Sequence, residues 1–356
     1  MTTTSPLVSG NIFIFQAFDV GEEMDLKGIS QRRLVTPSPQ ALPKYFKNYH
    51  IPLSIVPPRA QGNGYACEHA KLHNFGAISL RYRIPFSTTL EELRTLVVTT
   101  DEQYAEQSLR DGETIFNRIK SEIKQPRFSQ GRNDYVLIQM EELPGGKDLG
   151  TVKQEYGHLL ASLLRFETES LSEHVRDEIL TDAFSYYHKD LIIIDTQAAL
   201  LCDNDYDEVL DLFDFANIQH LELQFFDRML DKKLNLAYEQ DRKSPPLRSY
   251  LPFVGMMVSD PVGELSRLKV DISVITDRLE TSIKLAGEAY ISQLYAVLSE
   301  KLDLANWKES ISRKLAIIQD IGSIYEHKLE VIREDLLTCS IIVLILLELL
   351  MGLLVH

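Results

Sequence analysis

Apolar and polar positions follow two different patterns along the chain. In the first part, the short apolar runs Asn11–Val20 and Asp190–Ile194 have the length and β-branched content of buried strands. Phe75–Ile84 alternates between apolar and polar residues, as a strand with one polar face does. Helical patterns lie between these runs. Strands interleaved irregularly with helices predict an α+β body over residues 11–204, after a flexible start at residues 1–10.

Beyond this body the apolar positions repeat with a helical period. Residues 205–258 are predicted to be a helical connection that prolines interrupt. Two apolar seams follow, over Leu265–Leu298 and Trp307–Leu336, with the capping-box spacing Asn306–Glu309 between them. Matching seams joined by a short connection predict a long antiparallel helical hairpin at residues 259–335. Two separate amphipathic helices packed on the body are the alternative.

The C-terminal stretch Leu336–Val355 is the most apolar part of the chain. Fifteen of its twenty residues are Leu, Ile, Val or Met, and Glu348 is its single charged residue. Such a helix spans about 30 Å, the thickness of the hydrocarbon core of a bilayer. The pattern predicts a C-terminal transmembrane helix at residues 336–356, a single-pass tail anchor in which Glu348 is an intramembrane polar residue. A helix buried within a soluble oligomer is the alternative.

Composition and charge limit the kinds of partner and the cellular compartment that we expect for this chain. With 44% hydrophobic residues among 356, the chain has ample material for a core. The net charge of -15 and the lack of clustered Lys and Arg argue against direct nucleic-acid binding. Three widely separated cysteines favour a reducing compartment, and residues 1–11 do not resemble a signal or transit peptide. We therefore expect the body to lie in the cytoplasm.

Candidate chemistry is sparse. Cys67, His69 and His73 are residue types that bind zinc, which takes three or four such ligands in tetrahedral geometry. No second ligand cluster accompanies them, so the default interpretation is a loop of surface polar residues. The known phosphate-loop, nucleophile-elbow and zinc-protease motifs do not occur in the sequence. The sequence therefore predicts no catalytic residue, no metal site and no cofactor.

Several segments of the sequence resemble those of a known protein family. Ser185–Ala199, Phe215–Asp227 and Leu230–Leu234 together resemble the Required for Meiotic Nuclear Division family, and the resemblance extends to Phe75–Ser79 and to the helix that begins near Trp307. The resemblance implies a membrane-associated, self-associating protein without established enzymatic activity. The chain looks like a bacterial member, which would place it at the bacterial inner membrane.

Polar residues that match this family pattern lie among apolar ones. They are Tyr187, Asp190, Asp195, Asn217, Glu222 and Asp227. Because buried polar groups are normally hydrogen-bonded, we expect a structural polar network where the body meets the long helices.

These observations predict a membrane-anchored, non-enzymatic scaffold. Its cytoplasmic body recruits an unidentified protein partner, and its hairpin makes it a homo-oligomer. The alternative is a cryptic metal-binding protein or enzyme with a site near Cys67, His69 and His73.

Overall fold

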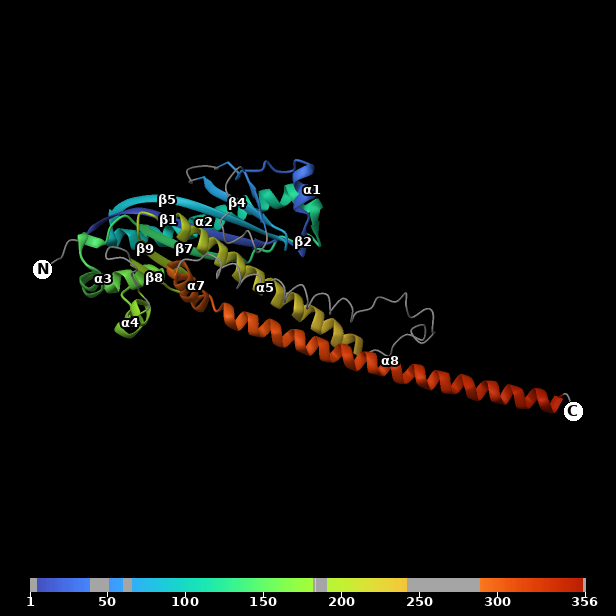
Figure 1. Cartoon of the computed structure of the whole chain (residues 1–356). Helices are drawn as coiled ribbons and strands as arrows, with labels where there is room; N and C mark the ends of the chain where they lie inside the picture. Colours follow the sequence, from blue (N-terminus) through green and yellow to red (C-terminus); the bar gives the residue numbers. More distant parts are fainter. Residues whose placement is uncertain are drawn as a thin grey trace. The chain divides into compact units, whose positions relative to one another are not determined.

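The computed structural model describes residues 5–38, 51–59, 66–181, 183, 191–241 and 289–354 (Figure 1). The chain divides into two compact units. The first comprises Met1–Gln224 and Asp277–Ala305, and the second comprises Phe225–Thr276 and Asn306–His356.

The first unit is built on a seven-stranded sheet. Its neighbouring strands are antiparallel, except that β7 and β9 run parallel. In order of pairing, the strands are β3 (Leu53–Ile55), β4 (Cys67–His73), β5 (Ala77–Thr89), β1 (Leu7–Asp19), β7 (Arg132–Met140), β9 (Ala198–Cys202) and β8 (Leu191–Ile194). A separate two-stranded sheet joins β2 (Glu23–Met24) to β6 (Ile123–Lys124).

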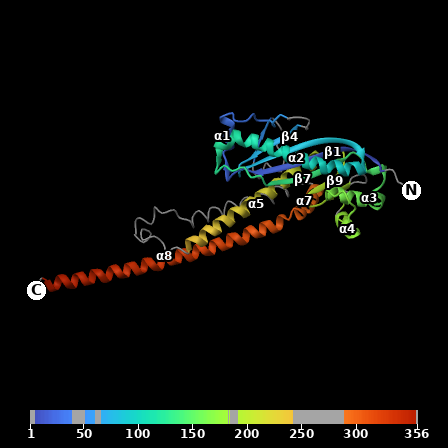
Figure 2. The same ribbon diagram turned by 180° about the vertical axis from the view of Figure 1, so that it is seen from behind.

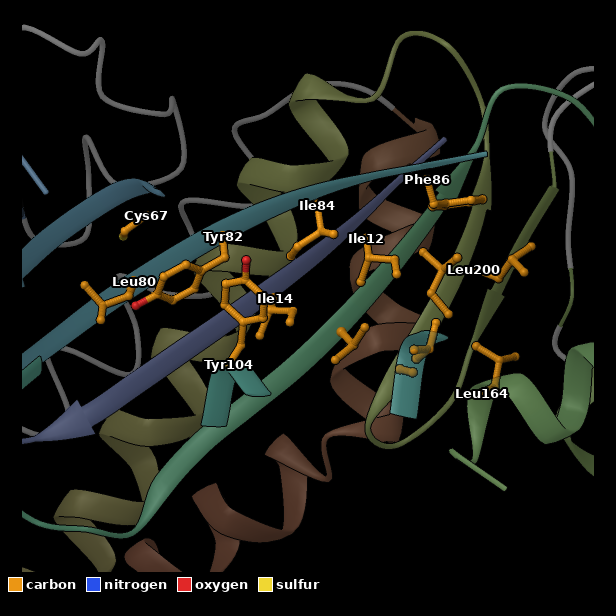
Figure 3. Close-up of a cluster of buried hydrophobic side chains, with 14 of the residues drawn as sticks. Ile12, Ile14, Cys67, Leu80, Tyr82, Ile84, Phe86, Tyr104, Leu164 and Leu200 are labelled. Carbon is orange, nitrogen blue, oxygen red and sulfur yellow. The ribbon is translucent and has the colours of Figure 1, made fainter. Parts of the chain in front are cut away.

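Strand β1 lies at the centre of the large sheet and is buried on both faces. Ile12 and Ile14 point into the main core on one face, whereas Phe13 and Phe15 are buried on the other. In the main core, the rings of Tyr82 and Tyr104 lie 5.0 Å apart between centroids, next to Ile14 (Figure 3). The strand predicted at Asn11–Val20 is thus confirmed, and burial on both faces explains why its apolar run is continuous rather than alternating.

Strand β5 runs through Pro85, where the alternating pattern first suggested an end. Pro85 pairs with Asn11 of β1, and the strand continues to Thr89. On the other side, β4 pairs with β5 only as far as Tyr82, so Pro85 faces no partner strand there among the described residues. A proline, which lacks an N–H, is tolerated at such an edge.

Helices of the first unit cover both faces of the sheet. In the described part of the chain the helices are α1 (Leu26–Gln31), α2 (Leu90–Ile119), α3 (Leu149–Leu164), α4 (Glu173–Thr181), α5 (Asp207–Asp241), α7 (Ala289–Lys301) and α8 (Leu304–Leu354), with short 3-10 turns at Lys120–Glu122 and Pro144–Gly146. Helices α2, α3 and α4 contribute to the main core, and the first part of α5 covers the opposite face, where Phe213 contacts Tyr135 at 5.3 Å between ring centroids. The predicted α+β body is confirmed as a helix–sheet–helix sandwich.

Helix α2 begins with a capping box. The Thr89 hydroxyl accepts a hydrogen bond from the Glu92 N–H at 3.3 Å, and the Glu92 carboxylate accepts one from the Thr89 N–H at 3.2 Å. This pairing satisfies two backbone donors that the first turn of a helix leaves free. It fixes the point at which β5 turns into α2.

The second unit contains the end of α5 and most of α8. Ile311, Leu315 and Ile318 of α8 are buried, as the predicted seam requires. Lys314 Nζ lies 2.7 Å from Asp227 Oδ1 and 2.6 Å from Asp231 Oδ1 on α5. The first arm of the predicted hairpin, residues 259–288, lies outside the described residues.

The structure corrects the prediction of a C-terminal transmembrane helix. Residues 336–354 form the end of the 51-residue helix α8 rather than an element of their own, and this part of α8 runs on beyond the end of α5 (Figure 2). Within the described residues, no helix combines the length and apolar character needed to cross a bilayer. The C-terminal transmembrane helix, the single-pass tail anchor, the inner-membrane location and the intramembrane position of Glu348 are therefore wrong.

The prediction rested on the length of the run, its fifteen aliphatic residues and its single charge. Val355, its last residue, lies outside the described residues. Thr338 and Ser340 interrupt the run and hydrogen-bond to backbone carbonyls of Glu334 and Leu337, at 2.9 and 2.7 Å. Glu348 is exposed.

Candidate functional site

A cluster of charged and polar side chains lies on the sheet face that α5 covers. On β4, alternate residues His69, Lys71 and His73 point to this face, because successive side chains of a strand point to opposite sides. Arg81 of the neighbouring β5 lies opposite His69. Helix α5 adds Asp211 and Asp214 from above. We call His69, Lys71, Arg81, Asp211 and Asp214, together with Glu68, the charge cluster.

The innermost part of the charge cluster is the ion pair between Lys71 and Asp214. The two side chains are only 4% and 8% exposed, and Lys71 Nζ contacts Asp214 Oδ2 directly. A buried charge is tolerated only when it is paired, so each of these residues depends on the other. The pair attaches α5 to the sheet.

The outer part of the charge cluster surrounds Arg81. Arg81 Nη2 lies 2.6 Å from His69 Nε2, and its Nε donates to Glu68 Oε2 at 3.2 Å. Burial, followed by the positive charges of Arg81 and Lys71, lowers the pKa of His69 to about 3. A neutral His69 can accept a hydrogen bond from Arg81 through Nε2. Arg81 is therefore engaged by both of its neighbours, Glu68 and His69.

Asp211 carries the most perturbed carboxyl of the charge cluster. Burial raises its pKa to about 6, assisted by the negative charges of Asp214 and Asp207 and opposed by Lys71 and Arg81. Since the folded-state pKa lies above the ordinary value of 3.8, the folded chain holds this proton more tightly than the unfolded chain. The resulting stability is fully present below about pH 4 and is lost as the pH rises through about 6.

We expect Asp211→Asn to flatten this pH dependence. Without screening, the shift corresponds to about 3 kcal/mol. The side chain is 35% exposed, so solvent screening reduces the expected difference to about 1 kcal/mol. Urea unfolding at pH 4 and pH 7 measures it: the wild type should lose about 1 kcal/mol more than the variant. Asp205→Asn, an exposed carboxyl just before α5, is the control, and equal losses in Asp211→Asn and the wild type would contradict the assignment.

Cys67 faces the opposite side of the sheet from the charge cluster. Its Sγ donates to the carbonyl oxygens of His69 and Arg81 at 3.1 and 3.6 Å, and burial raises the pKa of the thiol. A register shift between Cys67 and His69 separates their side chains. His73 is fully buried, with Nε2 2.9 Å from Ser79 Oγ. Cys67, His69 and His73 therefore do not converge, and in the described part of the chain no group of three or more potential ligands is arranged to hold a metal ion.

The segment from Cys67 to His73 is also a buried strand and not the surface loop that its polar residues suggested. Sequence reasoning missed Lys71 and Arg81 as members of the site. Their signal is alternation: polar residues at every second position of a segment whose other positions are apolar, such as Ala70 and Leu72.

A second set of polar contacts extends the charge cluster along the same face. Asn11 Nδ2 donates to Gln139 Oε1 at 2.8 Å, and Arg83 Nε donates to Asn11 Oδ1 at 2.9 Å. Gln139 Nε2 donates to the backbone oxygen of Asp203 at 3.0 Å. Three neighbouring strands and the segment that leads into α5 are thereby joined.

The predicted polar network is divided among separate contacts. Tyr187 and Asp190 lie outside the described residues. Asp195 pairs with Arg165 at 2.5 Å between Oδ2 and Nε, and Asn217 Oδ1 accepts from Asn133 Nδ2 at 3.0 Å.

The other two described residues of the predicted network, Glu222 and Asp227, lie in different units. Glu222 is buried in the first unit, and burial raises its pKa well above the ordinary value. Asp227 belongs to the second unit, where the Ser310 hydroxyl donates to its Oδ1 at 2.8 Å. The contacts of Asp195, Asn217 and Asp227 each hold neighbouring elements together, which is a local structural role.

A comparison with known proteins finds similarity to an archaeal protein. The Uncharacterized protein MJ0711 of Methanocaldococcus jannaschii is 26% identical over 252 residues, which cover 68% of this chain and 72% of that protein. No solved structure matches the chain. The predicted membership of the Required for Meiotic Nuclear Division family, as a bacterial member, is therefore wrong.

The reason for that error lies in the segments that carried the resemblance. These segments are short: Ser185–Ala199 includes strand β8, and Phe215–Asp227 is a largely buried part of α5. A longer match is more specific: residues 9–208 match the family described as Uncharacterized protein MJ0711, N-terminal domain. Because this match covers more than half of the 356 residues, the chain belongs to the MJ0711 N-terminal domain family.

Proposed function

We propose that this chain is a self-associating, non-enzymatic scaffold, and that α8 is the surface through which copies associate. The observation that carries the proposal is the exposure of the segment Ile341–Met351, which we call the apolar end. Ten of its eleven residues are large and apolar, and each of the ten is between 52% and 66% exposed.

The apolar end is too large to be left in water. Burying one such side chain removes roughly 60–120 Å² of apolar surface, so ten half-exposed ones amount to roughly 500 Å². Monomeric proteins rarely expose contiguous apolar patches of more than a few hundred Å². A helix that is apolar all round is normally enclosed by other helices. A second copy of the same helix supplies a matching surface, and homo-oligomers are the commonest assemblies.

In this proposal the charge cluster of the first unit has a structural role. Lys71 pairs with Asp214, and Arg81 is held by Glu68 and His69. Charges engaged in this way hold the sheet and α5 together. We therefore propose that the body presents a rigid surface to a protein partner, while α8 joins copies of the chain.

The oligomeric state tests this proposal. Sedimentation velocity in detergent-free buffer compares the full chain with a chain that ends at Asp335. We expect a discrete oligomer for the full chain and a monomer for the shortened one, because only the full chain has the apolar end.

A full-length variant controls for the change of length. Leu344→Asn with Leu347→Asn keeps every residue in place but removes two side chains that are 65% and 55% exposed, and it should weaken association at least tenfold. A full chain that sediments as a monomer, or as aggregates without a defined stoichiometry, contradicts the proposal.

A further inference from the structure

Helix α8 has a second exposed apolar surface before the apolar end. Ile317, Ile324 and Val331 are 42%, 54% and 44% exposed. Each is seven residues from the next, and at this spacing the position around a helix shifts by only about 20° per step, or about 40° from Ile317 to Val331. They therefore form a single row, which we call the apolar stripe.

The apolar stripe is distinct from the seam that α8 already buries. Ile311, Leu315 and Ile318 are at most 7% exposed, and at 100° per residue they lie roughly on the opposite side of the helix from the stripe. Charged, exposed residues such as Asp320 and Glu330 flank the stripe. A narrow apolar row with a seven-residue repeat is the pattern by which helices coil around each other.

We infer that two α8 helices pair in parallel and in register, so that a second copy of this chain covers the apolar stripe and the apolar end together. The inference rests on the proposed self-association and specifies its geometry. A stable interface buries about 800 Å² on each partner, and the apolar end supplies roughly 500 Å² of it. The stripe and the adjoining Leu336 and Leu337, which are 44% and 62% exposed, bring the surface close to that size.

Only the parallel arrangement matches surfaces of equal width. An antiparallel pair centred on the apolar end leaves both stripes uncovered. An antiparallel pair centred near Glu334 places the wide apolar end of each helix against the narrow apolar stripe of the other. This arrangement removes the charged Asp320 and Glu330 from water, and the narrow stripe does not cover the whole apolar end. In the parallel pair, stripe meets stripe and end meets end.

Cysteine cross-linking tests the register in the full chain. In a Cys339→Ser background, single substitutions Ile317→Cys, Val331→Cys and Ile345→Cys sample positions about 42 Å apart from first to last. Disulfide formation requires Cα atoms within about 7 Å. In a parallel pair all three variants should cross-link to themselves on oxidation, whereas an antiparallel pair allows this only near its symmetry axis. The native Cys67 and Cys202 are buried.

The control is Glu330→Cys, the residue next to Val331 but off the stripe. We expect at least tenfold less disulfide-linked dimer from it than from Val331→Cys. If the chain sediments as an oligomer while only one of the three stripe and end positions cross-links, or none does, the parallel register is overturned and the self-association stands. If the chain sediments as a monomer, both are overturned.

Discussion

Replacing Lys71 by Met is expected to lower the free energy of unfolding by about 3–5 kcal/mol. The substitution keeps the long apolar stem but removes the ammonium group that neutralises Asp214, whose side chain is 8% exposed. An uncompensated carboxylate would then be buried between β4 and α5, and burial of an isolated charge is strongly unfavourable. Urea denaturation at pH 7, followed by far-UV circular dichroism, measures the loss.

Two further variants separate this effect from a general loss of packing. The double variant Lys71→Met with Asp214→Leu removes both charges and should recover most of the stability, because a buried ion pair can be replaced by apolar residues at little cost. Arg110→Met breaks the exposed pair with Glu106, in which the side chains are 61% and 79% exposed, and should cost at most about 0.5 kcal/mol. If Lys71→Met behaves like Arg110→Met, the pair is not desolvated and the charge cluster does not attach α5 to the sheet.

Local periodicity was sufficient to predict much of the fold. The run around Ile12 and Ile14 and the seam of Ile311 and Leu315 are each confirmed. In each case the deciding interactions are between residues close in sequence, or follow from one buried face of a regular element. Such features require no knowledge of the tertiary partner.

The charge cluster could not be predicted in this way. Lys71 is buried only because Asp214, 143 residues further along the chain, lies against it. Nothing near Cys67–His73 in the sequence indicates that partner, so the polar residues of this segment alone predict a loop. Tertiary context decided between strand and loop, as it often does for strands.

The C-terminal correction has a physical cause. The prediction relied on the apolar character of one segment, which measures its preference for leaving water but does not identify the surface that covers it. An apolar run such as Ile341–Met351 is compatible with several such surfaces. The proposed parallel pairing with a second α8 uses the additional exposed row at Ile317, Ile324 and Val331, which only the structure separates from the buried seam.

The close approach of β1 and β7 at Gly10 leads to the second large expected effect. A Cβ atom on residue 10 would lie 1.9 Å from the backbone oxygen of Gln139 and 3.0 Å from Met140 Cα, and backbone atoms cannot rotate away. Gly10→Ala must therefore push the two strands apart, and we expect it to lower the free energy of unfolding by about 3 kcal/mol. The separation would also stretch the bond from Asn11 to Gln139, which is next to the substitution.

The matched control for this substitution is Gly131→Ala. At that exposed position the nearest atom to a new Cβ is Ser129 Oγ at 3.4 Å, so the change should stay within about 0.5 kcal/mol. Urea unfolding of both variants gives the comparison, and amide hydrogen exchange shows where the loss lies, with faster exchange expected for β7 residues opposite Gly10. Equal stability of Gly10→Ala and Gly131→Ala would mean that β1 and β7 are further apart at this point than the register requires. In that case the spacing of β1 and β7 would not support the hydrogen bonds that run from Asn11 through Gln139 to the segment before α5.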